Sequence, residues 1–122
     1  MTRDFPAYRK ELKALIAGLR KQAPEALAGF GQLHEGAMKA GALGVKQKEL
    51  IALGIGIASR CDGCIAFHTH EALVEGATRQ EIVETIAVGV MMGGGPSLMY
   101  SAHAIEALEQ FESAGAGSAK SG

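Results

Sequence analysis

The amino-acid sequence predicts an all-α protein, a compact bundle of about six helices. Three observations support this fold class. Apolar residues recur at helical spacing along most of the chain, clusters of glycine and proline divide it into helix-length segments, and no segment alternates apolar and polar residues as a half-buried strand does. A chain of 122 residues, 48% of them hydrophobic, can bury a single core. We assign residues 1–112 to one helical domain and the small, glycine-rich residues 113–122 to a disordered C-terminal tail.

Two helices are predicted before the first clear break. Asp4 is a suitable N-cap for the first helix, and Pro6 fits its first turn. The second helix begins near Pro24, and the glycines in residues 41–44 end the segment. We expect the apolar stripe of the first helix to be buried; it consists of Tyr8, Leu12, Leu15, Ile16 and Leu19. One side of the second helix carries Leu27, Phe30, Leu33 and Met38.

Four further helices have equally clear boundaries. Gly76 ends the fourth, Thr78 and Glu81 form a capping box for the fifth, and the three glycines and proline of residues 93–96 precede the sixth. The third helix is apolar over much of its surface, so we expect it to be central and largely buried. We place these helices at about residues 46–59, 61–75, 78–91 and 97–111.

Composition excludes several classes of partner. The net charge is −1 and no basic stripe is present, which argues against binding to nucleic acid or to an anionic membrane. The longest apolar run, residues 50–58, is too short to span a bilayer. The N-terminus lacks the apolar segment of a secretory signal, so we expect a cytoplasmic protein. In that compartment, a close-spaced cysteine pair is more often catalytic or metal-binding than structural.

The two cysteines lie three residues apart, and a histidine follows four residues later. On a helix with about 100° per residue, Cys61, Cys64 and His68 fall on one stripe roughly 60° wide. His68 follows Cys64 by one turn and can accept a thiol proton at neutral pH. In the first turn of the helix, the free N–H groups and Arg60 would favour thiolates, while Asp62 would partly oppose them. This segment therefore has the elements of a redox site.

A carboxylate can be placed beside His68 by geometry. If the third and fourth helices pack antiparallel around a turn near residues 59–61, Glu49 lies about 15 Å from the turn and His68 about 12 Å. A long side chain can bridge this offset, so Glu49 could orient His68 and hold its proton. From helical period alone, a solvated surface carboxylate is an equally good interpretation of Glu49.

The spacing of these four residues resembles a family signature. Glu49, eleven residues, Cys61-x-x-Cys64, three residues and His68 is similar to the pattern of the AhpD-like alkylhydroperoxidases, in the carboxymuconolactone decarboxylase superfamily. The flanking segments CIAFHTHEAL, EGATRQEI and GGGPSLMY agree, and the resemblance covers roughly residues 25–111. The cysteine pair alone would be weak evidence, whereas the spacing with its flanks is specific.

The resemblance implies an all-α fold, homo-oligomers that are commonly trimers or hexamers, and thiol-dependent reduction of hydroperoxides. It also implies Glu49, Cys61, Cys64 and His68 as the catalytic set, and we predict no metal or organic cofactor. The chain is shorter than the two-repeat peroxidase that names the group, so one domain per subunit is expected. Decarboxylases of the superfamily lack the cysteine pair, and its presence argues against that activity here.

Other interpretations of the same residues are less specific. The cysteines could be inert core residues, or they could bind zinc with His68 and His70, although one helix stripe offers at most three ligands where structural sites use four. His70 suits a surface or interface better than a catalytic role. A triple glycine before Pro96 follows no predicted strand, so nucleotide binding is rejected. For His34, and for the group Tyr100, His103 and Glu106 on one helical face, structural roles are favoured over supporting roles in the site.

The leading functional hypothesis is a thiol peroxidase. His68, supported by Glu49, would deprotonate Cys64, which attacks the hydroperoxide and becomes a sulfenic acid. Cys61 would then form the disulfide, and an external dithiol, of the lipoyl type or thioredoxin-like, would reduce it. Two alternatives stay open: a general disulfide oxidoreductase, and a metal-binding or stress-sensing protein without turnover.

Overall fold

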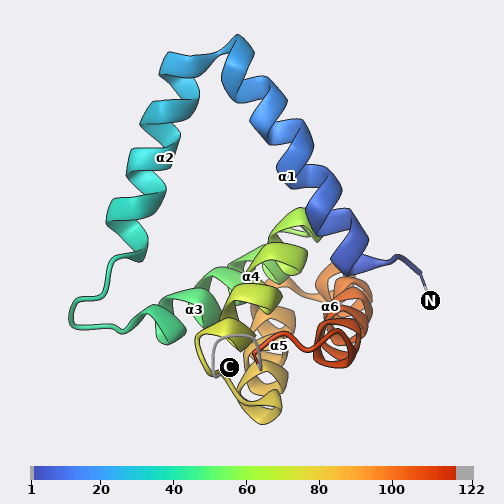
Figure 1. Cartoon of the computed structure of the whole chain (residues 1–122). Helices are drawn as coiled ribbons and strands as arrows, with labels where there is room; N and C mark the ends of the chain where they lie inside the picture. The colour runs from blue at the N-terminus through green and yellow to red at the C-terminus, as the bar shows by residue number, and fades with distance from the viewer. Residues whose placement is uncertain (1, 118–122) are drawn as a thin grey trace.

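A computed structural model describes residues 2–117 and shows a bundle of six helices (Figure 1). They are α1 (Phe5–Gln22), α2 (Pro24–Met38), α3 (Val45–Ala58), α4 (Asp62–Val74), α5 (Arg79–Gly93) and α6 (Gly95–Ser113). The predicted fold class is confirmed, as is the position of the cysteine pair at the start of the fourth helix. Within residues 2–117, no helix is long and apolar enough to cross a membrane.

Helices α3 to α6 form the bundle and its core. α3 packs against both α4 and α5, and α6 contacts all three. Each fully buried aliphatic side chain in such a core contributes about 1.5–3 kcal/mol. Phe5, from the first turn of α1, is also completely buried. The other large fully buried apolar side chains are Leu53, Ile57, Ile65, Ile82 and Leu108.

Glycines allow α3 and α5 to approach closely. A Cβ atom at Gly89 would lie 3.0 Å from the carbonyl oxygen of Gly54 and 3.1 Å from the Cβ of Ile57. A larger residue at Gly89 would press on both neighbours, so glycine allows α5 to pack closely against α3 at Gly54.

Local signals explain where helices begin. The side chain of Asp4 accepts a hydrogen bond from the Ala7 N–H at 3.0 Å. Thr78 and Glu81 form the predicted capping box at the start of α5. Gly94, with a φ of 76°, separates α5 from α6. The sixth helix begins at Gly95, slightly earlier than predicted, because a proline in the next position fits its first turn.

The second half of α1 and all of α2 project from the bundle as a V-shaped arm, defined as residues 13–38 (Figure 1). Every residue from 13 to 22 is exposed, and α2 contains no buried residue. The prediction of one buried stripe on α1 is therefore wrong for its second half. Tyr8 packs against the core, but Leu15 is 70% exposed. The stripe continues past the edge of the bundle, where no described residue of this chain covers it.

The prediction that α3 is largely buried holds for one face only. Leu53 and Ile57 are fully buried between the neighbouring helices, whereas Ile51 and Ile55 are exposed. At the other end of the chain, α6 ends at Ser113, and Ala116 in the following turn packs against the core. Residues 118–122 of the predicted disordered tail lie outside the described residues.

Candidate active site

The turn between α3 and α4 positions the first cysteine. α3 ends in a Schellman motif, in which the Arg60 N–H donates to the Ile57 carbonyl (3.1 Å) and the Cys61 N–H donates to the Gly56 carbonyl (2.9 Å). Arg60 is the left-handed residue of this motif, with a φ of 59°, a conformation that costs a non-glycine residue about 1–2 kcal/mol. The reversal places Cys61 at the N-cap of α4, one position before the helix itself.

The N-cap position gives Cys61 a specific electrostatic environment. Its Sγ accepts a hydrogen bond from the Cys64 N–H at 3.1 Å, and it lies in the partial positive charge of the helix N-terminus. Both effects stabilise a thiolate in the reduced protein. In the structure the two cysteines form a disulfide, with Cα atoms 5.2 Å apart, within the usual range for such a bond.

Glu49 and His68 form a carboxylate–imidazole pair across α3 and α4. Nδ1 of His68 lies 2.7 Å from Oε1 of Glu49, and the two side chains are 21% and 8% exposed, respectively. The predicted contact is therefore present, and Glu49 is not a solvated surface carboxylate. Because a carboxylate only accepts, Nδ1 carries the hydrogen, and Nε2 is the basic nitrogen of a neutral His68 ring. His68 lies one helical turn beyond Cys64, on the same face of α4.

Gly56 lets α3 approach α4 at the second cysteine. A Cβ atom at this position would lie 2.8 Å from the Cβ of Cys64. Gly56 lies two helical turns after Glu49 on α3, and its carbonyl also accepts the Cys61 N–H. One glycine therefore helps to position both cysteines relative to the carboxylate on the same helix.

A second carboxylate–imidazole pair lies at Asp62, between the cysteines in sequence. Nδ1 of His103, on α6, is 2.7 Å from one oxygen of Asp62, and Nη2 of Arg3 is 3.6 Å from the other. The two residues lie 41 positions apart, and no sequence pattern links them. Their contact depends on how α6 crosses α4, which no local spacing encodes.

The remaining side chains on that face of α6 have structural partners. The ring of Tyr100 packs against that of His103, with centroids 4.9 Å apart. Glu106 accepts hydrogen bonds from the hydroxyl and N–H of Thr2 and from the N–H of Arg3. These bonds, with that from the Thr2 hydroxyl the strongest, lower the pKa of Glu106. Glu106 therefore ties the N-terminal segment to α6.

The other two histidines are His70 and His34, and the contacts of His70 are with residues other than the cysteines. Nδ1 of His70 is 3.0 Å from Oε1 of Glu71, and its ring packs on Phe111 with centroids 5.3 Å apart. His34 is exposed on α2. Among residues 2–117, no group of three or more His, Cys, Asp or Glu side chains is arranged to hold a metal ion.

Fold and site together define a class of protein: an all-helical chain with a disulfide-forming CxxC pair at the start of a helix and a histidine–glutamate pair one turn behind it. The chain belongs to the carboxymuconolactone decarboxylase family, whose family model matches residues 24–107. The resemblance found in the sequence is thereby confirmed.

Similar proteins span nearly the same length. An uncharacterised protein of Cupriavidus necator is 35% identical over 105 residues, which cover 86% of this chain and 93% of the relative. The apo structure of a carboxymuconolactone decarboxylase family protein from Legionella pneumophila shares 47% identity and a TM-score of 0.84, covering 88% of this chain and 96% of that one. A Thermotoga maritima family member, for which an antioxidative role has been suggested, shares 31% identity and a TM-score of 0.69 over 72% and 91% of the two chains.

Proposed function

We propose that the protein is a thiol-dependent peroxidase that reduces alkyl hydroperoxides through the Cys61–Cys64 pair. The observation that carries this proposal is the 2.7 Å contact between Glu49 and His68, one helical turn from a disulfide-forming cysteine. A purely structural disulfide requires no base. The antioxidative role suggested for the Thermotoga maritima relative points the same way.

The reaction assigns a role to each of the four residues. Nε2 of His68 takes the proton of the Cys64 thiol, and Glu49 stabilises the resulting imidazolium. The thiolate attacks the terminal oxygen of the hydroperoxide, the O–O bond breaks, and the alkoxide takes the proton from His68 to leave as an alcohol. Cys61 then attacks the sulfenic sulfur of Cys64, which releases water and forms the disulfide. An external dithiol, of the lipoyl type or thioredoxin-like, reduces the disulfide by exchange and is itself oxidised.

The order of the cysteines follows from their surroundings. Cys64 lies one turn before His68 and is the peroxidatic residue. Cys61 is stabilised as a thiolate by the N-cap hydrogen bond, which makes it the better leaving group when the external dithiol resolves a mixed disulfide. Dimedone labelling of Cys61→Ser and Cys64→Ser variants after peroxide treatment tests the order. A sulfenate trapped on Cys61 in the Cys64→Ser variant, and none on Cys64 in the other, would reverse it.

Single-turnover oxidation of the reduced protein tests the function. Addition of cumene hydroperoxide should consume both thiols and yield one cumyl alcohol per disulfide. His68→Gln should slow this step by about 10²–10⁴-fold, the usual contribution of a general base. Glu49→Gln should slow it by about 10–100-fold, since it removes the group that orients the base. Glu11→Gln, an exposed carboxylate on α1, is the matched control. Equal rates in all four proteins would refute the proposal.

A general disulfide oxidoreductase is the second candidate, and the N-cap hydrogen bond to Cys61 favours it. An activated N-terminal thiolate is what exchange with a protein disulfide needs. Comparing turnover of cumene hydroperoxide with turnover of an oxidised protein substrate separates the two activities. Faster turnover of the protein disulfide, unaffected by His68→Gln, would select this candidate.

Two further expectations accompany the proposed peroxidase. The first is a cytoplasmic location, where reduced dithiols are available. The second is a homo-oligomer, trimeric or hexameric, as the family resemblance implies.

A further inference from the structure

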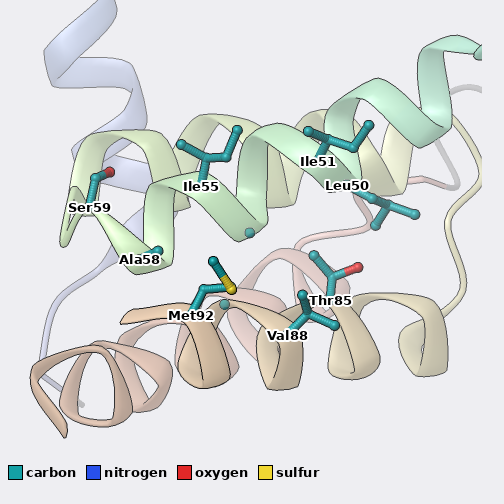
Figure 2. A pocket seen from close by; sticks show the side chains of 10 residues that line it. Leu50, Ile51, Ile55, Ala58, Ser59, Thr85, Val88 and Met92 are labelled. Carbon is teal, nitrogen blue, oxygen red and sulfur yellow. The ribbon is translucent and has the colours of Figure 1, made fainter. Parts of the chain in front are cut away.

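Two apolar surfaces are left exposed by residues 2–117. The first is the arm (residues 13–38), on which Phe30 and Leu33 are each 65% exposed. The second is a groove of about 610 Å³ between α3 and α5 (Figure 2). Ile55 on its α3 side is 63% exposed, and Met92 on its α5 side is 73% exposed. Exposed apolar surfaces of this extent mark sites of association.

The groove has the composition of a helix-binding surface. Figure 2 shows Leu50, Ile51 and Ile55 along α3, and Thr85, Val88 and Met92 along α5. Its floor is formed by glycines at positions 54 and 89, which hold no side chain in the channel. None of the lining residues is charged. An amphipathic helix that lays its apolar face into such a groove is a common mode of recognition.

The accessible surface of the chain is too large for a compact monomer. It measures 7244 Å², whereas a folded monomer of 12.6 kDa exposes about 6,200 Å². The excess, about 1,000 Å², is comparable to the area of about 800 Å² that each partner contributes to a stable interface. The arm contributes to this excess, because every residue of its α1 part is exposed and nothing in α2 is buried.

We propose that the arm of one copy of this chain docks in the α3–α5 groove of a second copy. Arm and groove belong to the same chain, so their apolar surfaces are present in equal number. The α1 end of the arm is anchored away from its own groove, on α4 and α6. Leu12 packs at Gly63 on α4, and Arg9 binds Glu71 at 3.1 Å. The groove lies on the α3–α5 side of the same bundle.

Docking between copies also bears on the redox site. Gly63 lies between the cysteines, and a Cβ atom there would be 3.2 Å from Cδ1 of Leu12. Leu12, directly before the arm, therefore contacts the CxxC segment at Gly63. A partner that holds the arm in place would hold this contact as well. The inference does not depend on peroxidase activity, since its readout is the assembly itself.

Light scattering and sedimentation velocity of the full chain give the first test. The wild-type protein should form a discrete oligomer. Phe30→Asp on the arm and Ile55→Asp in the groove should each weaken association by at least about thirtyfold, the effect of losing an interface hot spot. Gln32→Asp is the matched control, because it adds the same charge to α2 about 200° away from Phe30. A monomeric wild type, or equal loss in the control, would overturn the proposal.

Cross-linking identifies which surfaces meet. Chains that lack Cys61 and Cys64 through Ser substitutions are coexpressed with different tags, one carrying Phe30→Cys and the other Ile55→Cys. Oxidation should link the two different chains. Three results would refute the docking: Ile55→Cys chains linked only to each other, a link within one chain that carries both substitutions, or a monomer whose groove binds a fatty acid such as laurate. Circular dichroism confirms that each variant is folded.

A second inference concerns Asp62, and we propose that His103 is a positioning residue for the proposed thiol chemistry. The carboxylate of Asp62 follows Cys61 directly and would oppose a thiolate there. His103 from α6 and Arg3 from the N-terminal segment contact both of its oxygens. The rings of Tyr100 and Phe5 pack against that of His103, with centroids 4.9 Å and 6.4 Å away, and the Arg3 guanidinium also lies over the ring of Tyr8. His103 and Arg3 together thus offset the charge of Asp62 beside the cysteines.

The pH profile of iodoacetamide alkylation of the reduced protein tests this role without any peroxide. His103→Gln should move the midpoint of the fast-reacting thiolate upward by as much as about one pH unit. The double variant Asp62→Asn/His103→Gln should return to the wild-type midpoint or below, because no charge is left to offset. A midpoint that His103→Gln leaves unchanged, or one that the double variant does not restore, would refute the proposal. This readout stays valid if the peroxidase activity itself is absent.

Discussion

The α3–α6 bundle and the arm carry the same kind of apolar pattern but differ completely in burial. In the bundle, the stripe of α3 that contains Leu53 is sealed by α4 and α5. On the arm, the stripe of α1 that contains Leu15 and the stripe of α2 that contains Phe30 are exposed. Helical periodicity therefore identifies an apolar face on a helix, and it does not show whether the same chain buries that face. The same residue pattern thus occurs in the buried core and on the exposed arm.

The largest expected effect comes from matched truncations in the two regions. Leu53→Ala should lower the free energy of unfolding by about 2–5 kcal/mol, because it opens a cavity in a fully buried site. Phe30→Ala should change the stability of the dissociated chain by less than about 0.5 kcal/mol, as at other exposed sites. Urea unfolding at low protein concentration measures both. Similar losses in both variants would mean that the arm packs on its own bundle.

Gly56→Ala should give the next largest effect. The new methyl group meets the Cβ of Cys64 at 2.8 Å, and this overpacking costs about 1–3 kcal/mol. The loss exceeds the gain of about 0.5–1 kcal/mol that alanine brings to a helix. Thermal unfolding measures the balance, and slower disulfide formation in the same variant would show that the cysteine pair has moved. An unchanged protein would mean that α3 and α4 are not in close contact here.

Gly29→Ala on the arm should have the opposite sign. No atom lies within 4 Å of a Cβ placed there, so the substitution should stabilise α2 by about 0.5–1 kcal/mol through helix propensity alone. Far-UV circular dichroism and urea unfolding of the dissociated chain measure this gain. A loss of stability would indicate that this side of α2 is packed, and the contrast between the two regions would then be smaller than described.

The smallest effect concerns the acid stability of the bundle. The Thr78 N–H, and after it the Lys46 ammonium group, lower the pKa of Glu81. The folded state therefore binds this proton less tightly than the unfolded state, so Glu81 stabilises the fold at neutral pH. This contribution is lost as the pH falls below about 4. Glu81→Gln should flatten the decline in unfolding free energy in that range.

Lys46→Met is the control for this acid effect. It removes the ion pair at 3.0 Å but leaves the capping box intact. Most of the pH dependence should remain, because the backbone hydrogen bond is the larger cause of the shift. Loss of the whole effect in Lys46→Met would mean that the ion pair, and not the cap, governs the titration of Glu81.

Sequence alone predicted most of the fold and part of the site, for physical reasons that particular residues show. Helix starts at Asp4 and Thr78 follow from local capping, which neighbouring residues encode. The Glu49–His68 contact could be predicted because α3 and α4 are consecutive helices joined by a single short turn, so their register follows from the sequence. The Asp62–His103 pair was missed because it depends on the crossing of helices far apart in the chain.

The outward course of the arm was also missed, and for a different reason. Nothing in the pattern of residues 13–38 distinguishes a stripe buried in its own chain from one covered by another. Leu15 and Phe30 satisfy the rule for core positions equally well in both cases. Only the three-dimensional path of α1 beyond Leu12 shows that the stripe leaves the bundle.

Helix α3 carries a different task on each of its sides. Glu49 and Gly56 face α4 and the cysteines, while Ile51 and Ile55 face the groove, so about one helix diameter of roughly 10 Å separates them. A substitution on either of these sides of α3 would therefore disturb the cysteine site or the groove. The fourteen residues of α3 should therefore tolerate far fewer substitutions than those of α2. Random mutagenesis scored for folded, assembled protein would test this by comparing the number of accepted substitutions in the two helices.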